Sequence, residues 1–199
     1  YQYYMNPSKV AMAGKIQPNG SYLKGIEDFI PSSQYNCDKH HLKVVEDIKE
    51  NWVTLSLNSK FHALLATESI PEAIAYYRLL RKEMPTLKVT ALFDPNIDNT
   101  GGQTFKEEGL IEVLEGYKEQ FGKTYTMSTH AAFKQDVALR LAHKKPYNGK
   151  DFTKDKQIDL LIVVNQMLTG FDSKWINTLY VDKVMEYENI IQAFSRTNR

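Results

Sequence analysis

The sequence predicts an α/β fold in which a mostly parallel sheet is flanked by helices, with an irregular and helical amino-terminal segment before it. From Phe61 onward, short apolar runs typical of buried strands alternate with stretches whose apolar residues recur at helical spacing. Strands that alternate with helices favour parallel pairing, because each crossover needs a connection long enough for a helix. The composition, 42% apolar and 25% charged over 199 residues, suits one domain with a sizeable core and an appendage.

The amino-terminal segment is expected at 1–57 and the α/β domain at 58–199. Prolines, glycines and many polar residues over 1–36 indicate loops and short turns. Apolar residues near helical spacing between His41 and Trp52 then predict one amphipathic helix. We expect this helix to pack on the domain that follows it.

The α/β domain is expected to begin with a strand at Phe61–Ala66, followed by a helix that Ser69 caps. A serine hydroxyl can accept from a free N–H of the first turn, and Pro71 fits there because the N–H it lacks would have no helical partner. The remaining elements, in chain order, are a strand at Lys88–Phe93, a polar loop at 94–104, helices at Phe105–Phe121 and Thr129–His143, a lysine-rich connector at 144–156, strands at Ile158–Val164 and Thr178–Val181, and a helix from about Glu188.

The charge and cysteine content exclude several classes of protein. A formal net charge of +1 gives no global field toward nucleic acid or membrane, so any polyanion contact is local. No apolar run approaches the roughly 20 residues of a membrane helix, and no signal-peptide pattern is present. The lone Cys37 fits a reducing compartment, and with His40 and His41 it falls short of the four ligands of a structural zinc site. We therefore expect a cytoplasmic protein with no membrane partner and no metal site.

The strongest chemical signal follows the strand predicted at Ile158–Val164, in the run Thr169-Gly170-Phe171-Asp172. Ligands of open α/β sheets bind beyond the carboxyl ends of the strands. There Gly170 permits close backbone approach, Thr169 offers a hydroxyl to a phosphate, and Asp172 can accept from a ribose hydroxyl. A glycine turn with a solvated aspartate explains these residues about equally well.

Gln192, Arg196 and Arg199 are spaced by four and three residues, so a helix would place them on one face. Arginine stays charged and forks onto phosphate oxygens, as a transition-state arginine finger requires. A solvated basic helix end is the commoner explanation of two arginines alone, but Gln192 on the same face favours the phosphate role.

Two further features are candidates for contact with nucleic-acid phosphates. Thr67 and Ser69 stand where the first strand ends and a helix begins, and N–H groups at a helix start attract anions. Capping by Ser69 is at least as good an explanation, and the two roles are compatible. The lysine-rich stretch from Lys144 to Lys156 either lies along DNA or is a solvated connector, which is the default interpretation.

Several of these runs resemble the sequence motifs of a known protein family. The runs Thr169–Asp172 and Gln192–Arg199 resemble the fifth and sixth motifs of superfamily two helicases, and more narrowly the motor (R, restriction) subunit of type I restriction endonucleases. Phe61–Thr67 with the five residues from Ser69 is similar to the fourth motif region of that subunit, and Asn177–Lys183 also resembles its sequence. The resemblance covers about 40–199 and implies a second RecA-like motor domain.

The resemblance also implies roles for individual residues. Gly170 and Asp172 would face the nucleotide, Thr169 the nucleic acid, and Arg196 and Arg199 would reach ATP bound on the preceding RecA-like domain of the same polypeptide. Gln192 would couple that site. The implied partners are double-stranded DNA and the modification and specificity subunits, and the implied cofactors are ATP and Mg²⁺, held mainly by the first motor domain.

Other residues of such an enzyme are missing from the sequence. It contains no Gly-x-x-x-x-Gly-Lys-Ser/Thr loop and no strand-borne Asp-Glu pair for Mg²⁺, and we see no nuclease constellation of acids plus lysine. Tyr1 is not an initiator methionine and Arg199 stops inside a helical pattern, so we expect a piece of a larger protein that is inactive alone. Two alternatives remain: the second motor domain of a DNA repair or remodelling helicase, and a non-catalytic RecA-like interaction module.

Overall fold

The computed structural model describes residues 14–25, 36–97, 100–149, 153–164 and 173–183. The chain divides into two compact units, 1–43 and 44–199. In the first unit, β1 (Lys15–Ile16) pairs antiparallel with β2 (Tyr22–Leu23). Helix α1 (Asp38–Leu55) crosses the division between the units and confirms the amphipathic helix predicted there, with about one more turn at each end. The domain limits at 1–57 and 58–199 remain predictions.

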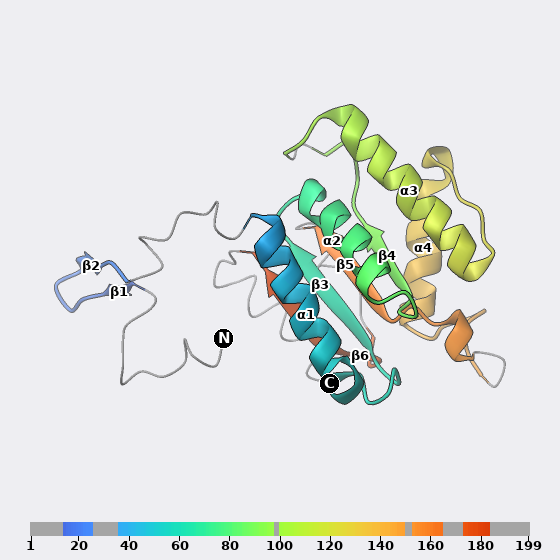
Figure 1. Cartoon of the computed structure of the whole chain (residues 1–199), viewed down its shortest axis with the longest axis horizontal. Coiled ribbons are helices and arrows are strands. Elements are labelled where there is room, and N and C mark those ends of the chain that lie inside the picture. The colour runs from blue at the N-terminus through green and yellow to red at the C-terminus, as the bar shows by residue number, and fades with distance from the viewer. Residues whose placement is uncertain (1–13, 26–35, 98–99, 150–152, 165–172, 184–199) are drawn as a thin grey trace. The chain divides into compact units, whose positions relative to one another are not determined.

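The second unit is built on a four-stranded parallel sheet in the order β4-β5-β3-β6 (Figure 1). The bounds of its strands are β3 His62–Thr67, β4 Val89–Leu92, β5 Leu160–Val164 and β6 Ile176–Asp182. Every neighbouring pair is parallel, which confirms the predicted α/β class and is consistent with a RecA-like fold.

Burial explains why these segments form strands in this order. All residues of β3, β4 and β5 are buried, and a continuous apolar run such as Leu160–Val164 is typical of a parallel strand covered on both faces. Strand β6, at one end of the strand order, is only partly buried, whereas β4 at the other end is buried along its whole length. Val45, Ile48 and Trp52 of α1 join the same hydrophobic core.

Helix α2 (Ile70–Glu83) connects β3 to β4 and begins with the cap that the sequence predicted. The Ser69 hydroxyl accepts from the backbone N–H of Glu72 at 3.3 Å, and the Glu72 carboxylate accepts from the backbone N–H of Ser69 at 3.1 Å. This reciprocal pair is a capping box, which satisfies two donors that the helix itself leaves without partners. In Figure 1, α1 and α2 lie in front of the sheet.

Helix α3 (Gln103–Phe121) packs closely on α2 because two of its residues lack a side chain. A Cβ on Gly109 would lie 2.2 Å from Ile74 Cδ1, and a Cβ on Gly116 would lie 1.9 Å from the Tyr77 hydroxyl oxygen. Neither position would accept a larger residue without displacing buried atoms of α2. Helix α4 (His130–Leu141) follows after the 3₁₀ turn η3 (Met127–Thr129), and η4 (Lys154–Lys156) precedes β5.

A buried carboxylate joins α3, α4 and the connector to β5. Asp136 accepts from the Tyr117 hydroxyl at 2.6 Å, Lys123 Nζ at 2.6 Å and Arg140 Nε at 3.1 Å, and also from the Tyr147 hydroxyl. Burial opposes the charge on Asp136, but these hydrogen bonds outweigh it and hold its pKa below the ordinary value. This network was not predicted from the sequence, because only Arg140 is at helical spacing from Asp136.

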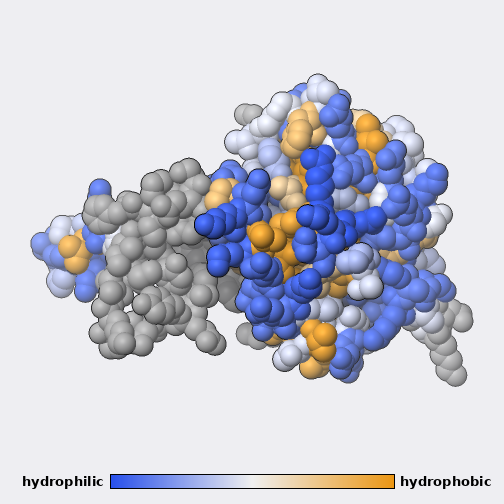
Figure 2. All heavy atoms as spheres, viewed as in Figure 1, coloured by the Kyte–Doolittle hydropathy of each residue, from blue (hydrophilic) through white to orange (hydrophobic). Residues whose placement is uncertain are grey.

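The visible face of the second unit is mostly hydrophilic (Figure 2). Near the end of α1, the apolar side chains of Val53, Leu55 and Leu57 are exposed. Among the described residues, no helix combines the length and the apolar character that crossing a bilayer requires.

Candidate functional site

The carboxyl ends of all four strands lie at one edge of the sheet, because every pair is parallel. Strand β5 ends at Val164, directly before the segment that carries Thr169, Gly170 and Asp172, and β6 ends at Asp182, shortly before the segment that carries the two arginines. The predicted site residues outside the described part of the chain are Thr169, Gly170, Asp172, Gln192, Arg196 and Arg199. Both segments thus follow, in sequence, strands whose carboxyl ends lie at the edge where parallel sheets bind ligands.

Thr67 is the last residue of β3, and its side chain is fully buried. Its hydroxyl lies 3.3 Å from the Ser69 carbonyl oxygen and 3.4 Å from the Val163 carbonyl oxygen, so its single proton is shared between two internal acceptors. These contacts join the ends of β3 and β5. A side-chain contact between Thr67 and DNA remains a prediction, and it would require this hydroxyl to leave both carbonyls.

Ser69 also lies at this edge, but the position where an anion would bind already holds a carboxylate. Glu72 Oε2 accepts from the backbone N–H groups of Glu68 and Ser69, each at 3.1 Å. Those N–H groups are the donors that a phosphate would use at the start of a helix. Capping by Ser69 is thus confirmed, whereas its predicted contact with DNA remains untested and would compete with the negative charge of Glu72.

A second polar pair at this edge was not predicted from the sequence. The buried Tyr76 hydroxyl of α2 donates to Asp182 at the end of β6. Burial, and then the hydrogen bond with Asp182, raise the pKa of Tyr76 far above its ordinary value, so the phenol stays protonated. An acid directly after a predicted strand was the available signal for Asp182, but Tyr76 lies 106 residues away in sequence.

The loop after β4 is held by the side chains of two lysines, Lys106 and Lys134. Asp94 Oδ1 accepts from the Asn96 backbone N–H at 3.0 Å, and Lys134 Nζ lies 3.7 Å from Asp94 Oδ2. Burial opposes ionisation of Asp94, but these partners together lower its pKa. The buried Lys106 ammonium donates to the Ile97 carbonyl at 3.2 Å, so it ties α3 to the loop after β4.

Three histidines of the second unit, His62, His130 and His143, have lowered pKa values. His62, at the start of β3, pairs with His143 at an Nε2 to Nε2 distance of 2.7 Å. Burial lowers the pKa of His62 to about 3 and that of His143 to about 4. The ring of His130 stacks on Phe133, and burial lowers its pKa as well. All three imidazoles are neutral near pH 7, so they suit structural roles better than proton transfer.

The described residues thus form the frame of a ligand site without a complete set of reacting groups. Among them, no group of three or more His, Cys, Asp or Glu side chains is arranged to hold a metal ion. The carboxyl edge presents the mixed charges of Glu68, Glu72, Asp182 and Lys183.

Comparison with known proteins shows the family to which this chain belongs. A family model described as type I restriction enzyme subunit R domain 3 matches residues 59–199. The type I restriction enzyme SauMRSORF196P endonuclease subunit of Staphylococcus aureus strain MRSA252 is 35% identical over 171 residues, which are 82% of this chain and 18% of that protein. The SsaAORF53P endonuclease subunit of Staphylococcus saprophyticus is 36% identical over 166 residues, 78% of this chain and 17% of that protein.

A further relative matches over a shorter stretch. The HindI endonuclease subunit of Haemophilus influenzae is 45% identical over 93 residues, 46% of this chain and 8% of that protein. The chain therefore spans less than a fifth of the length of these curated relatives. Because the family model covers most of the chain, including the whole described sheet, the chain belongs to the family of type I restriction enzyme subunit R, domain 3.

Proposed function

We propose that this chain is the second motor domain of the ATP-dependent subunit that translocates and cleaves DNA in a type I restriction-modification enzyme. The observation that carries the proposal is the family match over 59–199, on a parallel sheet whose carboxyl edge leads into both helicase-like motifs. The restriction names of the relatives favour this function over a repair helicase or a non-catalytic interaction module.

In this proposal, the chain completes an ATP site whose other half lies on the first motor domain. Arg196 and Arg199 would place guanidinium groups against the γ-phosphate, where negative charge grows in the transition state. Gln192, on the same predicted face, would link that contact to movement of the domain. Gly170 and Asp172 would approach the nucleotide, and Mg²⁺ would be held by the first motor domain. The chain alone would be inactive, because it contains no phosphate-binding loop.

The same domain would contact double-stranded DNA through Thr169, with contributions at Thr67 and Ser69 if Glu72 is displaced. The partners of the complete subunit would be the modification and specificity subunits, in the cytoplasm. For Ser69 the chemistry is feasible, because capping uses a lone pair of its oxygen and leaves the hydroxyl proton available to a phosphate.

The decisive experiment replaces Arg199→Ala in the complete subunit and measures ATP turnover stimulated by DNA. We expect turnover to fall by about a thousandfold, the lower end of what arginine fingers contribute. Arg78→Ala is the matched control, because Arg78 is an exposed arginine of α2 that pairs with Glu112. Near-normal turnover in the Arg199 variant would refute the finger role.

A further inference from the structure

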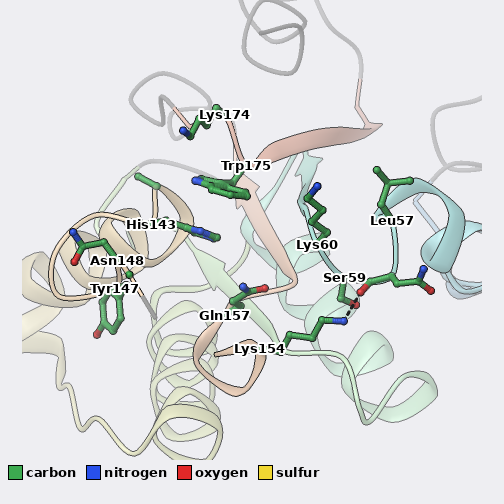
Figure 3. A pocket seen from close by; sticks show the side chains of 13 residues that line it. Leu57, Ser59, Lys60, His143, Tyr147, Asn148, Lys154, Gln157, Lys174 and Trp175 are labelled. Carbon is green, nitrogen blue, oxygen red and sulfur yellow. Dashed lines mark hydrogen bonds between the residues drawn. The ribbon is translucent and has the colours of Figure 1, made fainter. Parts of the chain in front are cut away.

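A cavity of about 720 Å³ opens at the amino edge of the sheet, opposite the edge at which the parallel strands end (Figure 3). Its walls come from three separate segments: the turn before β3, the connector between α4 and β5, and the turn before β6. The volume falls in the range of about 300–1,000 Å³ that is usual for ligand sites.

The lining of this cavity carries an excess of positive charge. Lys60, Lys154 and Lys174 line it, and the thirteen described residues around it include no aspartate or glutamate. Within the described part of the chain, none of these three ammonium groups lies within 4.0 Å of a carboxylate. The charge of Lys174 also acts on the neighbouring His143. Burial, and then this charge, lower the pKa of the His143 imidazole.

One wall of the cavity is held rigidly by aromatic rings. The His143 ring stacks on Trp175, with centroids 4.2 Å apart and an interplanar angle of 16°, and it also pairs with the buried His62. Lys174 Nζ lies 5.5 Å from the centre of the Trp175 ring. Figure 3 shows Trp175 between Lys174 and the His143 ring, with Lys60 on the other side of the opening.

The cavity lining includes a buried polar atom with unused hydrogen-bonding capacity. Gln157 Oε1 has no hydrogen-bond partner among the residues that the structure describes. A half-turn about the terminal torsion of Gln157 exchanges this acceptor for the two N–H donors of the amide. Beside it, Lys154 Nζ donates to the Asn58 carbonyl at 2.6 Å, which fixes one of the three cations at the cavity wall.

We propose that this cavity binds a phosphate-bearing anion. Three ammonium groups that have no carboxylate within 4.0 Å among the described residues match a multivalent anion better than a single carboxylate. Lysine binds phosphate as a point charge, without the planar geometry that arginine imposes. The bound group is either a free polyphosphate or the backbone of a nucleic acid. Its place at the amino edge makes the site independent of the ATP and DNA contacts proposed above.

Trp175 provides a local signal for the test, because the chain contains only one other tryptophan, the buried Trp52. The chain is titrated with tripolyphosphate, with a DNA duplex and with a short polyglutamate peptide while tryptophan fluorescence is recorded. The double variant Lys60→Gln with Lys174→Gln is compared with Lys82→Gln with Lys118→Gln, which removes the same charge from exposed positions of α2 and α3.

We expect phosphate ligands to change the fluorescence, and the change to disappear in Trp175→Phe. The cavity double variant should bind about tenfold more weakly, while the control pair binds as the parent does. For duplex DNA, the slope of log affinity against log salt should fall by about 1.8 in the cavity variant. A response to tripolyphosphate alone identifies a free polyphosphate as the ligand, and a response to duplex that tripolyphosphate reverses identifies the nucleic-acid backbone.

Three results would overturn the proposal. Equal weakening in the two double variants would show that only overall charge matters. Stronger binding of polyglutamate than of either phosphate ligand would identify the cavity as a docking site for an acidic protein segment. Absence of any fluorescence or binding response to both phosphate ligands would exclude a phosphate site, provided that circular dichroism shows the chain to be folded.

Discussion

Replacing Asp136→Asn tests whether one buried carboxylate holds α3, α4 and the connector to β5 together. All four partners of Asp136 are donors in the structure: two tyrosine hydroxyls, an ammonium and a guanidinium. An asparagine keeps one acceptor oxygen but brings two N–H donors into a site without a described acceptor for them. The tyrosine hydroxyls can turn to accept, whereas Lys123 and Arg140 cannot.

The geometry indicates which way the asparagine would turn. An amide nitrogen in place of Oδ2 would face Arg140, whose side chain is only 3% exposed and has no route to water. In place of Oδ1 it would face Lys123, whose side chain is 42% exposed and can swing into solvent. We therefore expect the second orientation, which keeps the hydrogen bonds from Arg140 and Tyr117 but loses the charge.

The cost should lie at the lower end of the range for breaking a buried ion pair, about 3 kcal/mol in the free energy of unfolding. With a urea m-value of about 2 kcal/mol per molar, the unfolding midpoint falls by about 1.5 M at constant m. Tryptophan fluorescence reports the transition, and Glu115→Gln on exposed α3 surface is the control of equal charge change. A loss below about 0.5 kcal/mol, the usual range for surface changes, would refute the reasoning.

Three further outcomes follow from the same contacts. The pKa values of His62 and His143 are lowered to about 3 and about 4, so both stay neutral in the folded chain at pH values where the unfolded chain binds protons. The free energy of unfolding should therefore fall as the pH drops below about 6.5, by about 1.4 kcal/mol per pH unit for each histidine that is protonated only when unfolded. A urea midpoint equal at pH 7 and pH 5 would contradict this. Gly116→Ala should lower the free energy of unfolding by about 1–3 kcal/mol, since the new Cβ would lie 1.9 Å from the Tyr77 hydroxyl oxygen. An unchanged melting temperature would show that α2 and α3 separate freely. Ser69→Ala should cost about 1 kcal/mol in thermal unfolding, while Ser69→Gly should cost only a few tenths; an unchanged stability of Ser69→Ala would mean that the capping hydroxyl is unimportant.

The parts of the fold that were predictable depend on residues close together in sequence. Leu160–Val164 is a strand because five successive apolar side chains need cover on both faces, and that requirement is visible without the rest of the chain. Ser69 caps α2 because its partner, Glu72, is three residues away. The same locality explains why the parallel sheet could be predicted from the alternation of strands and helices.

The parts that were missed depend on residues far apart in sequence. His62 and His143 are separated by 81 residues, and Tyr76 and Asp182 by 106, so neither pair leaves a periodic signal. Even at Ser69, where the cap was foreseen, the occupancy of the helix start by the Glu72 carboxylate came from side-chain geometry. That occupancy bears directly on how a phosphate could bind there.

The α/β class, the order of elements and the family resemblance follow from the sequence alone, because hydrophobic period and short motifs are encoded over a few neighbouring residues. Which charges meet depends on the tertiary structure. It joined four donors on Asp136 and gathered Lys60, Lys154 and Lys174 around one cavity. The physical reason is that electrostatic and hydrogen-bond energies depend on distances in space, which the packing of the sheet and helices sets.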